Sequence, residues 1–107
     1  MKIDIKVTNI ELTAPLREYI EDKIGGLEKF LVRFNTDSIF AAVDVGRSTN
    51  HHKQGEIFYT DVNLELPGKI LRAKKESEDV RASIDAVKDA MQQSIKKYLG
   101  QQFEDHR

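Results

Sequence analysis

Basic side chains lie along one flank of a helix that the sequence predicts from about residue 80 to residue 98. Apolar residues at steps of three and four mark its buried face, and at 100° per residue the flank beside that face carries Arg81, Lys88 and Lys96. Cations on a rigid helix can bind RNA, which proteins recognise largely by shape, 2′-hydroxyls and phosphates. On pattern alone, an ordinary solvated helix face is the favoured explanation of these residues, because mixed charge is common on exposed helices.

A second basic group lies in a polar loop between residues 46 and 55 and consists of Arg47, His51, His52 and Lys53. One interpretation is RNA contact, with histidines that gain charge as the pH falls. Metal binding is another, but adjacent histidines without a cysteine or a well-spaced third ligand are a poor zinc signal. A third is a polar hairpin tip with no specific role. We treat the loop as a secondary RNA contact and predict no metal site.

Motifs for catalysis are missing from the sequence. It contains no cysteine, no glycine-rich phosphate loop, no GxSxG and no HExxH. The carboxylate pairs Glu78-Asp79 and Glu104-Asp105 fit a helix start and a polar tail better than acid–base chemistry. We therefore predict that the protein is not an enzyme and that it uses no cofactor and no small-molecule substrate.

Length and charge limit the remaining classes of protein. The 107 residues are 39% hydrophobic and 33% charged, which suits one domain with one core. Lysine and arginine total 17 against 18 acidic residues, a net charge of −1, so an RNA-binding protein would have to gather its cations on one side. No apolar run approaches the roughly 20 residues of a membrane span. Without a signal segment at the N-terminus, we expect a cytoplasmic protein with no membrane contact.

The elements that would position these cations follow from hydrophobic periodicity. Alternating apolar residues predict strands at about 3–7, 39–45 and 58–66, and a short strand at 71–73. Thr13 can cap a helix of about 20 residues that runs through Gly25-Gly26, because its apolar stripe keeps its phase to Phe34. The second helix is expected to end at Gly100. Residues 1–100 then form a single domain and residues 101–107 a short polar tail.

The order β-α-β-β-β-α predicts an α+β fold with a four-stranded mixed sheet and two helices packed on one face. We expect Tyr19, Gly26 and Phe30 on the first helix to pack against a flank of small residues on the second, which would leave the basic flank in solvent. That small flank consists of Ser83, Ala86, Ala90 and Ser94. The outer face of the sheet would carry Phe40, Ile57, Tyr59 and Ile70, as a base-stacking platform, a weak self-association surface or scattered apolar groups.

Several short segments together resemble one known family. They are Ile3–Ile5, Ile10–Thr13, Leu16–Ile20, Leu27–Phe30, Val45–Arg47, His51–Gly55, Glu78–Val80 with Ala82, Ile84–Ala86 and Lys96–Lys97. In this order and spacing they are similar to the ribosome hibernation promoting factors, also called ribosome-associated inhibitors or ribosomal subunit interface proteins. The resemblance spans nearly the whole chain and favours the short form of the family, which lacks a C-terminal dimerisation domain.

The resemblance implies a function. Members of this family have the β-α-β-β-β-α fold, similar to a double-stranded-RNA-binding domain, and bind ribosomal RNA of the small subunit in the channel for messenger and transfer RNA. They inhibit translation and stabilise inactive, hibernating ribosomes under stress or slow growth. The alternative is a homodimeric or protein-binding α+β module that does not contact RNA.

The resemblance also bears on the RNA-binding residues. Lys23, Lys29, Lys96 and Lys97 match basic positions of the family, whereas Arg81 and Lys88 are added by helix geometry. We expect these six residues to carry the RNA contact. Family members commonly have a basic residue where this chain has Gly26, Ala90 and Gln93, and each missing phosphate contact lowers the salt-dependent part of binding.

Overall fold

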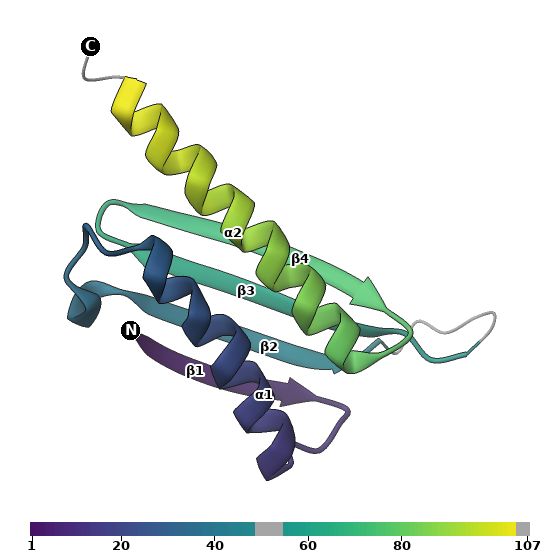
Figure 1. Cartoon of the computed structure of the whole chain (residues 1–107). Helices are drawn as coiled ribbons and strands as arrows, with labels where there is room; N and C mark the ends of the chain where they lie inside the picture. The colour runs from purple at the N-terminus through teal and green to yellow at the C-terminus, as the bar shows by residue number, and fades with distance from the viewer. Residues whose placement is uncertain (49–54, 105–107) are drawn as a thin grey trace.

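The predicted α+β fold is confirmed by the computed structural model, which describes residues 1–48 and 55–104 (Figure 1). The elements along the chain are β1 Lys2–Thr8, α1 Ala14–Gly25, η1 Gly26–Phe30, η2 Thr36–Ser38, β2 Phe40–Arg47, β3 Phe58–Leu66, β4 Lys69–Ser77 and α2 Val80–Glu104. The two η elements are short 3₁₀ helices, in which the backbone winds more tightly than in an α-helix.

The four strands form one mixed sheet in the order β1-β2-β3-β4. β1 and β2 are parallel, which is possible because the chain between them crosses over the sheet through α1. The two later pairs are antiparallel. Ile5 lies opposite Val43, Val43 opposite Val62, and Val62 opposite Ala73. Side chains alternate between the two faces of a strand, so this register places one apolar row under the helices.

Both helices cover the same face of the sheet (Figure 1). α1 packs over β1, and α2 packs mainly over β3 and β4. The helices run side by side in the same direction, and the last turns of α2 extend past the sheet. Buried residues from all of these elements, including Ile20, Ile24, Val62, Met91 and Ile95, form one core.

The first helix is shorter than predicted. The α-helix ends at Gly25, and the chain tightens into η1 instead of continuing to Phe34. Two adjacent glycines cost about 1 kcal/mol each relative to alanine in a helix, which weakens the α-helical geometry at this point. The apolar spacing still serves the core, because Leu27 and Leu31 are fully buried.

Two later boundaries were also wrong. β4 pairs with β3 along its full length, Lys69–Ser77, although its polar edge residues hid the alternation and suggested a short strand at 71–73. α2 continues through Gly100 to Glu104. A glycine stops a helix best in the left-handed conformation, and among the described glycines only Gly55 and Gly68 have positive φ.

The helix starts are capped as the sequence predicts. Thr13 Oγ1 accepts a hydrogen bond of 3.3 Å from the backbone N–H of Leu16, and Asp79 Oδ2 accepts one of 3.1 Å from Ala82. Such caps satisfy backbone donors that lack partners in the first turn. No helix in the described part of the chain is long and apolar enough to cross a membrane.

Candidate RNA interface between the helices

α1 packs against the charged flank of α2, which corrects the predicted packing of the two helices. Tyr19 contacts Asp85 and Arg81 on α2, and further along the chain Phe30 contacts Lys96. Ser83, on the small flank, is instead fully buried and shares a 2.8 Å hydrogen bond with Thr60 of β3. The basic flank therefore borders α1 instead of standing alone in solvent.

A ring from α1 collects charged groups at the start of this contact. The Tyr19 hydroxyl donates a 2.6 Å hydrogen bond to Asp85 Oδ1, and Lys23 Nζ lies 3.7 Å from the same oxygen. Arg81 Cζ lies 4.9 Å and Lys23 Nζ 5.4 Å from the centre of the Tyr19 ring, within the range of cation–π attraction. The hydrogen bond to the Asp85 carboxylate, and after it burial, raises the pKa of Tyr19 above its usual value.

A second ring repeats the arrangement closer to the end of η1. Lys29 Nζ lies 5.4 Å from the centre of the Phe30 ring, and Lys96 Nζ from α2 lies 5.3 Å from it. Phe30 is half-buried against the core, whereas both lysines are exposed. The ring therefore anchors two lysine stems while their ammonium groups stay available to solvent and ligands.

These two groups lie one after the other along the border between the helices, and together we call them the interhelical seam. Its members are Tyr19, Lys23, Lys29, Phe30, Arg81, Asp85 and Lys96. Among the described residues, Asp85 is the one carboxylate that pairs with a seam cation. The four cations outnumber Asp85 and the nearby Asp79, whose charge also acts on Tyr19, so the helices present a surface suited to phosphate groups.

The other two predicted RNA-binding lysines have different surroundings. Lys88 is half-buried, and its Nζ lies 3.8 Å from Asp89 Oδ1. Lys97 is exposed. At 100° per residue it lies about 160° around α2 from Arg81, on the opposite side of the helix. The structure thus places Lys23 and Arg81 at the Tyr19 ring and Lys29 and Lys96 at the Phe30 ring, pairs Lys88 with Asp89, and turns Lys97 away from α1.

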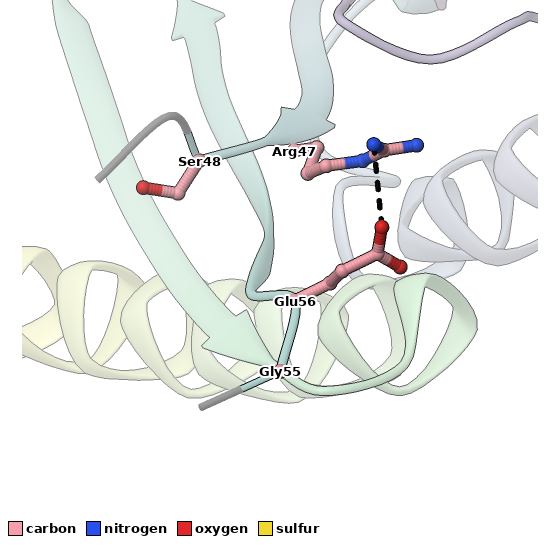
Figure 2. A pocket seen from close by; sticks show the side chains of 4 residues that line it. All are labelled: Arg47, Ser48, Gly55 and Glu56. Atoms are coloured by element: carbon pink, nitrogen blue, oxygen red, sulfur yellow. Dashed lines mark ion pairs between the residues drawn. The ribbon is translucent and has the colours of Figure 1, made fainter. Parts of the chain in front are cut away.

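The predicted loop contact is only partly described. Arg47 and Glu56 face each other across a shallow pocket that Ser48 and Gly55 also line, with 3.3 Å between Arg47 Nη1 and Glu56 Oε1 (Figure 2). This ion pair offsets the charge that Arg47 would offer a phosphate. His51, His52 and Lys53 lie outside the described residues, so their role stays a prediction.

The outer face of the sheet is mixed and polar, not a continuous apolar platform. Glu65 lies between Phe40 and Ile70 in one cross-strand row, while Tyr59 belongs to another row. Ile57 precedes β3 and lies outside the sheet. Base stacking over this face is not favoured by such spacing, and weak self-association through it stays a prediction.

Asp85 is the residue of the seam that sequence reasoning missed. No local pattern marks it, because only the packing of α1 brings Tyr19 and Lys23 to it. No group of three or more His, Cys, Asp or Glu side chains in the described residues could hold a metal ion. The chemistry available at the seam is therefore that of cations, one carboxylate and two aromatic rings.

Comparison with known proteins assigns the chain to a family and agrees with the fold. The ribosome hibernation promotion factor of Lactococcus lactis is 34% identical over 98 residues, which cover 92% of this chain and 49% of the relative. That of Deinococcus radiodurans is 31% identical over 93 residues, 84% of this chain and 44% of the relative. The chain thus spans about half the length of these curated relatives. The ribosome hibernation promoting factor of Pseudomonas putida is 26% identical over 102 residues, 95% of this chain and 90% of the relative.

Solved structures share the fold. The N-terminal domain of Thermus thermophilus Protein Y superimposes with a TM-score of 0.73 at 24% identity, over 92% of this chain and 99% of that one. A ribosomal subunit interface protein from Coxiella burnetii gives 0.73 at 21% identity, over 94% and 99%. The family model described as "Sigma 54 modulation protein / S30EA ribosomal protein" matches residues 3–102. The resemblance seen in the sequence is thereby confirmed, and the chain belongs to the sigma 54 modulation protein / S30EA ribosomal protein family.

Proposed function

We propose that this protein is a ribosome-associated translation inhibitor, which binds small-subunit ribosomal RNA in the channel for messenger and transfer RNA and stabilises inactive ribosomes when growth slows. The family and the printed names of its relatives support a role on the ribosome. The observation that carries the RNA contact is the gathering of four cations in the interhelical seam. On this proposal the protein acts in the cytoplasm, by occupying a site and without catalysing a reaction.

The seam suits RNA because its cations are already positioned before binding. Arg81 and Lys23 flank Tyr19, and Lys96 flanks Phe30, so these side chains lose less conformational freedom when a phosphate binds. The helices that carry them pack on one core, which fixes the distances between the cations. Because Asp85 pairs with Lys23, the other three cations would make the logarithm of affinity fall with the logarithm of salt concentration with a slope of about −2.5.

Occupation of the channel accounts for inhibition without further chemistry. A folded domain held against RNA there would exclude messenger and transfer RNA from the same space. Of the large apolar side chains described, only Val32, in the turn after η1, and Ile70, on β4, are prominently exposed. The described residues therefore present no large apolar patch that would favour the alternative of a homodimeric or protein-binding module.

The test is binding to purified small ribosomal subunits across a series of salt concentrations. The seam variant is Lys29→Glu/Lys96→Glu, because both side chains are exposed and neither forms an ion pair with a described residue. Its matched control is Lys2→Glu/Lys6→Glu, which makes the same charge change at exposed positions of β1. Surface substitutions of this kind usually change the free energy of unfolding by no more than about 0.5 kcal/mol.

We expect the seam variant to bind less tightly and its salt slope to become less steep by about 2, while the control retains binding. Inhibition of translation in a reconstituted system should fall with binding. Equal loss in both double variants would mean that net charge alone drives the association, and full binding by the seam variant would place the contact elsewhere.

A further inference from the structure

β4 carries a second concentration of positive charge that the seam does not explain. Four of its nine residues, Lys69, Arg72, Lys74 and Lys75, are basic, and we call them the β4 strip. All four are exposed, and none forms an ion pair with another described residue. Opposing charge nearby comes from Glu76 on the same strand, from Asp61, the cross-strand partner of Lys74, and from Glu65, which lines one hollow with Lys69.

The strip lies along the open edge of the sheet, because β4 is the last strand and pairs only with β3. Residues two apart on a strand are about 6.7 Å apart, comparable to the separation of neighbouring phosphates along a nucleic-acid strand. Arg72 and Lys74 have that spacing on the outer face. Lys75 projects on the helix side, so the strip can approach one chain of phosphates from both sides of the edge.

Two members of the strip are held by aromatic rings, as the seam cations are. Lys74 Nζ lies 5.0 Å from the centre of the Tyr59 ring, and Lys69 Nζ lies 5.7 Å from that of Tyr98 on α2. Lys97, which lies outside the seam, immediately precedes Tyr98 in the sequence and is exposed on the surface of α2. The strip therefore has its own rigid support on the side of α2 away from α1.

Protection of the sheet edge is the competing explanation. Lysines on an edge strand discourage pairing with other strands, and any charge of either sign serves that purpose. β1, the opposite edge, has only Lys2 and Lys6 with Asp4 between them. The excess of cations on β4 is thus larger than edge protection requires, since the other edge is protected by fewer and mixed charges.

We propose that the β4 strip is a second RNA-binding site, which takes the phosphate backbone of an RNA segment other than the one held by the seam. This inference rests on the proposed function, because it takes the ligand to be ribosomal RNA. Contacts on both sides of α2 would let the domain bridge two RNA segments.

The experiment compares Arg72→Glu/Lys75→Glu with the β1 control Lys2→Glu/Lys6→Glu in binding to small ribosomal subunits across a salt series. Both variants keep a charged edge and change net charge equally, so edge protection predicts the same result for each. We expect the β4 variant to bind about tenfold or more weakly, with a salt slope less steep by about 2. If that variant does not fold, Arg72→Gln/Lys75→Gln should show the same change in slope.

The outcomes separate the two proposals. Binding by the β4 variant that equals the β1 control would overturn the second site, while loss of binding with an unchanged salt slope would indicate a partner other than phosphate and overturn its assignment to RNA. If the seam variant loses binding and the β4 variant keeps it, only this inference fails. If the unmodified chain does not bind subunits, the proposed function fails as well.

Discussion

In the part of the chain that the structure describes, Asp85 is the one carboxylate that pairs with a cation of the interhelical seam, and its neutralisation tests how the seam works. Its Oδ1 accepts a 2.6 Å hydrogen bond from the Tyr19 hydroxyl and lies 3.7 Å from Lys23 Nζ. Asp85 therefore holds Lys23 in place but also repels any phosphate that approaches. Asp85→Asn keeps the shape and an acceptor oxygen, removes the charge and releases Lys23.

The effects on stability and on binding should have opposite signs. A hydrogen bond to a charged group contributes about 1.5–3 kcal/mol and a neutral one about 0.5–1.5 kcal/mol. The ion pair with Lys23, whose side chain is 39% exposed, adds well under 1 kcal/mol, because solvent screens it. We expect the free energy of unfolding of Asp85→Asn to fall by about 1 kcal/mol. One added phosphate contact should steepen the salt slope by about 0.7–0.9 and raise affinity about fivefold.

Three measurements check this prediction. Chemical denaturation gives the loss of stability, and subunit binding across a salt series gives affinity and slope. Titration of tyrosine absorbance should show the pKa of Tyr19 falling toward its usual value, because the carboxylate that raised it is gone, with Tyr19→Phe identifying its signal. Weaker RNA binding by Asp85→Asn at equal folded fraction would refute the reasoning, since it would make Asp85 a contributor to the contact.

Three further substitutions test the packing that supports the seam. Gly26→Ala should stabilise the protein by about 0.4–1 kcal/mol in chemical denaturation, because Gly26 has helical angles (φ −62°, ψ −17°) and its added Cβ would meet nothing within 4 Å; a loss of stability would contradict this. Gly46→Ala should destabilise by about 1–3 kcal/mol, because the new Cβ would lie 2.5 Å from the carbonyl oxygen of Thr8. An unchanged melting temperature would show that β1 can shift. Ser83→Ala should cost about 1–3 kcal/mol by leaving the buried Thr60 hydroxyl unpaired, and Thr60→Val in the same background should recover part of that loss.

Local patterns were enough to predict the fold because each element carries its own signal. Alternation around Val43 and Val62 gave the strands, and Thr13 marked the start of α1 correctly. The signals failed where two physical effects compete. At Gly25-Gly26 the apolar spacing of the helix continues, but glycine has a weak preference for α-helical backbone. The chain therefore tightens into the 3₁₀ helix η1, while Leu27 and Leu31 remain buried.

The candidate site could be predicted only in part, because it depends on how the two helices pack. Helical geometry places Arg81 and Lys96 on one flank of α2, and the structure confirms that placement. Helical geometry alone does not determine which flank of α2 meets α1, because that depends on where α2 lies over β3 and β4. Ser83, a small residue that suggested a helix contact, instead pairs with Thr60 on the sheet, and Tyr19 meets the charged flank.

The most direct test of the central claim is a cryo-electron microscopy structure of this chain bound to a small ribosomal subunit. We expect the domain to lie in the channel for messenger and transfer RNA, with Lys29, Arg81 and Lys96 within hydrogen-bond distance of ribosomal RNA phosphates. A complex in which the outer face of the sheet meets the RNA while the interhelical seam faces solvent would contradict it.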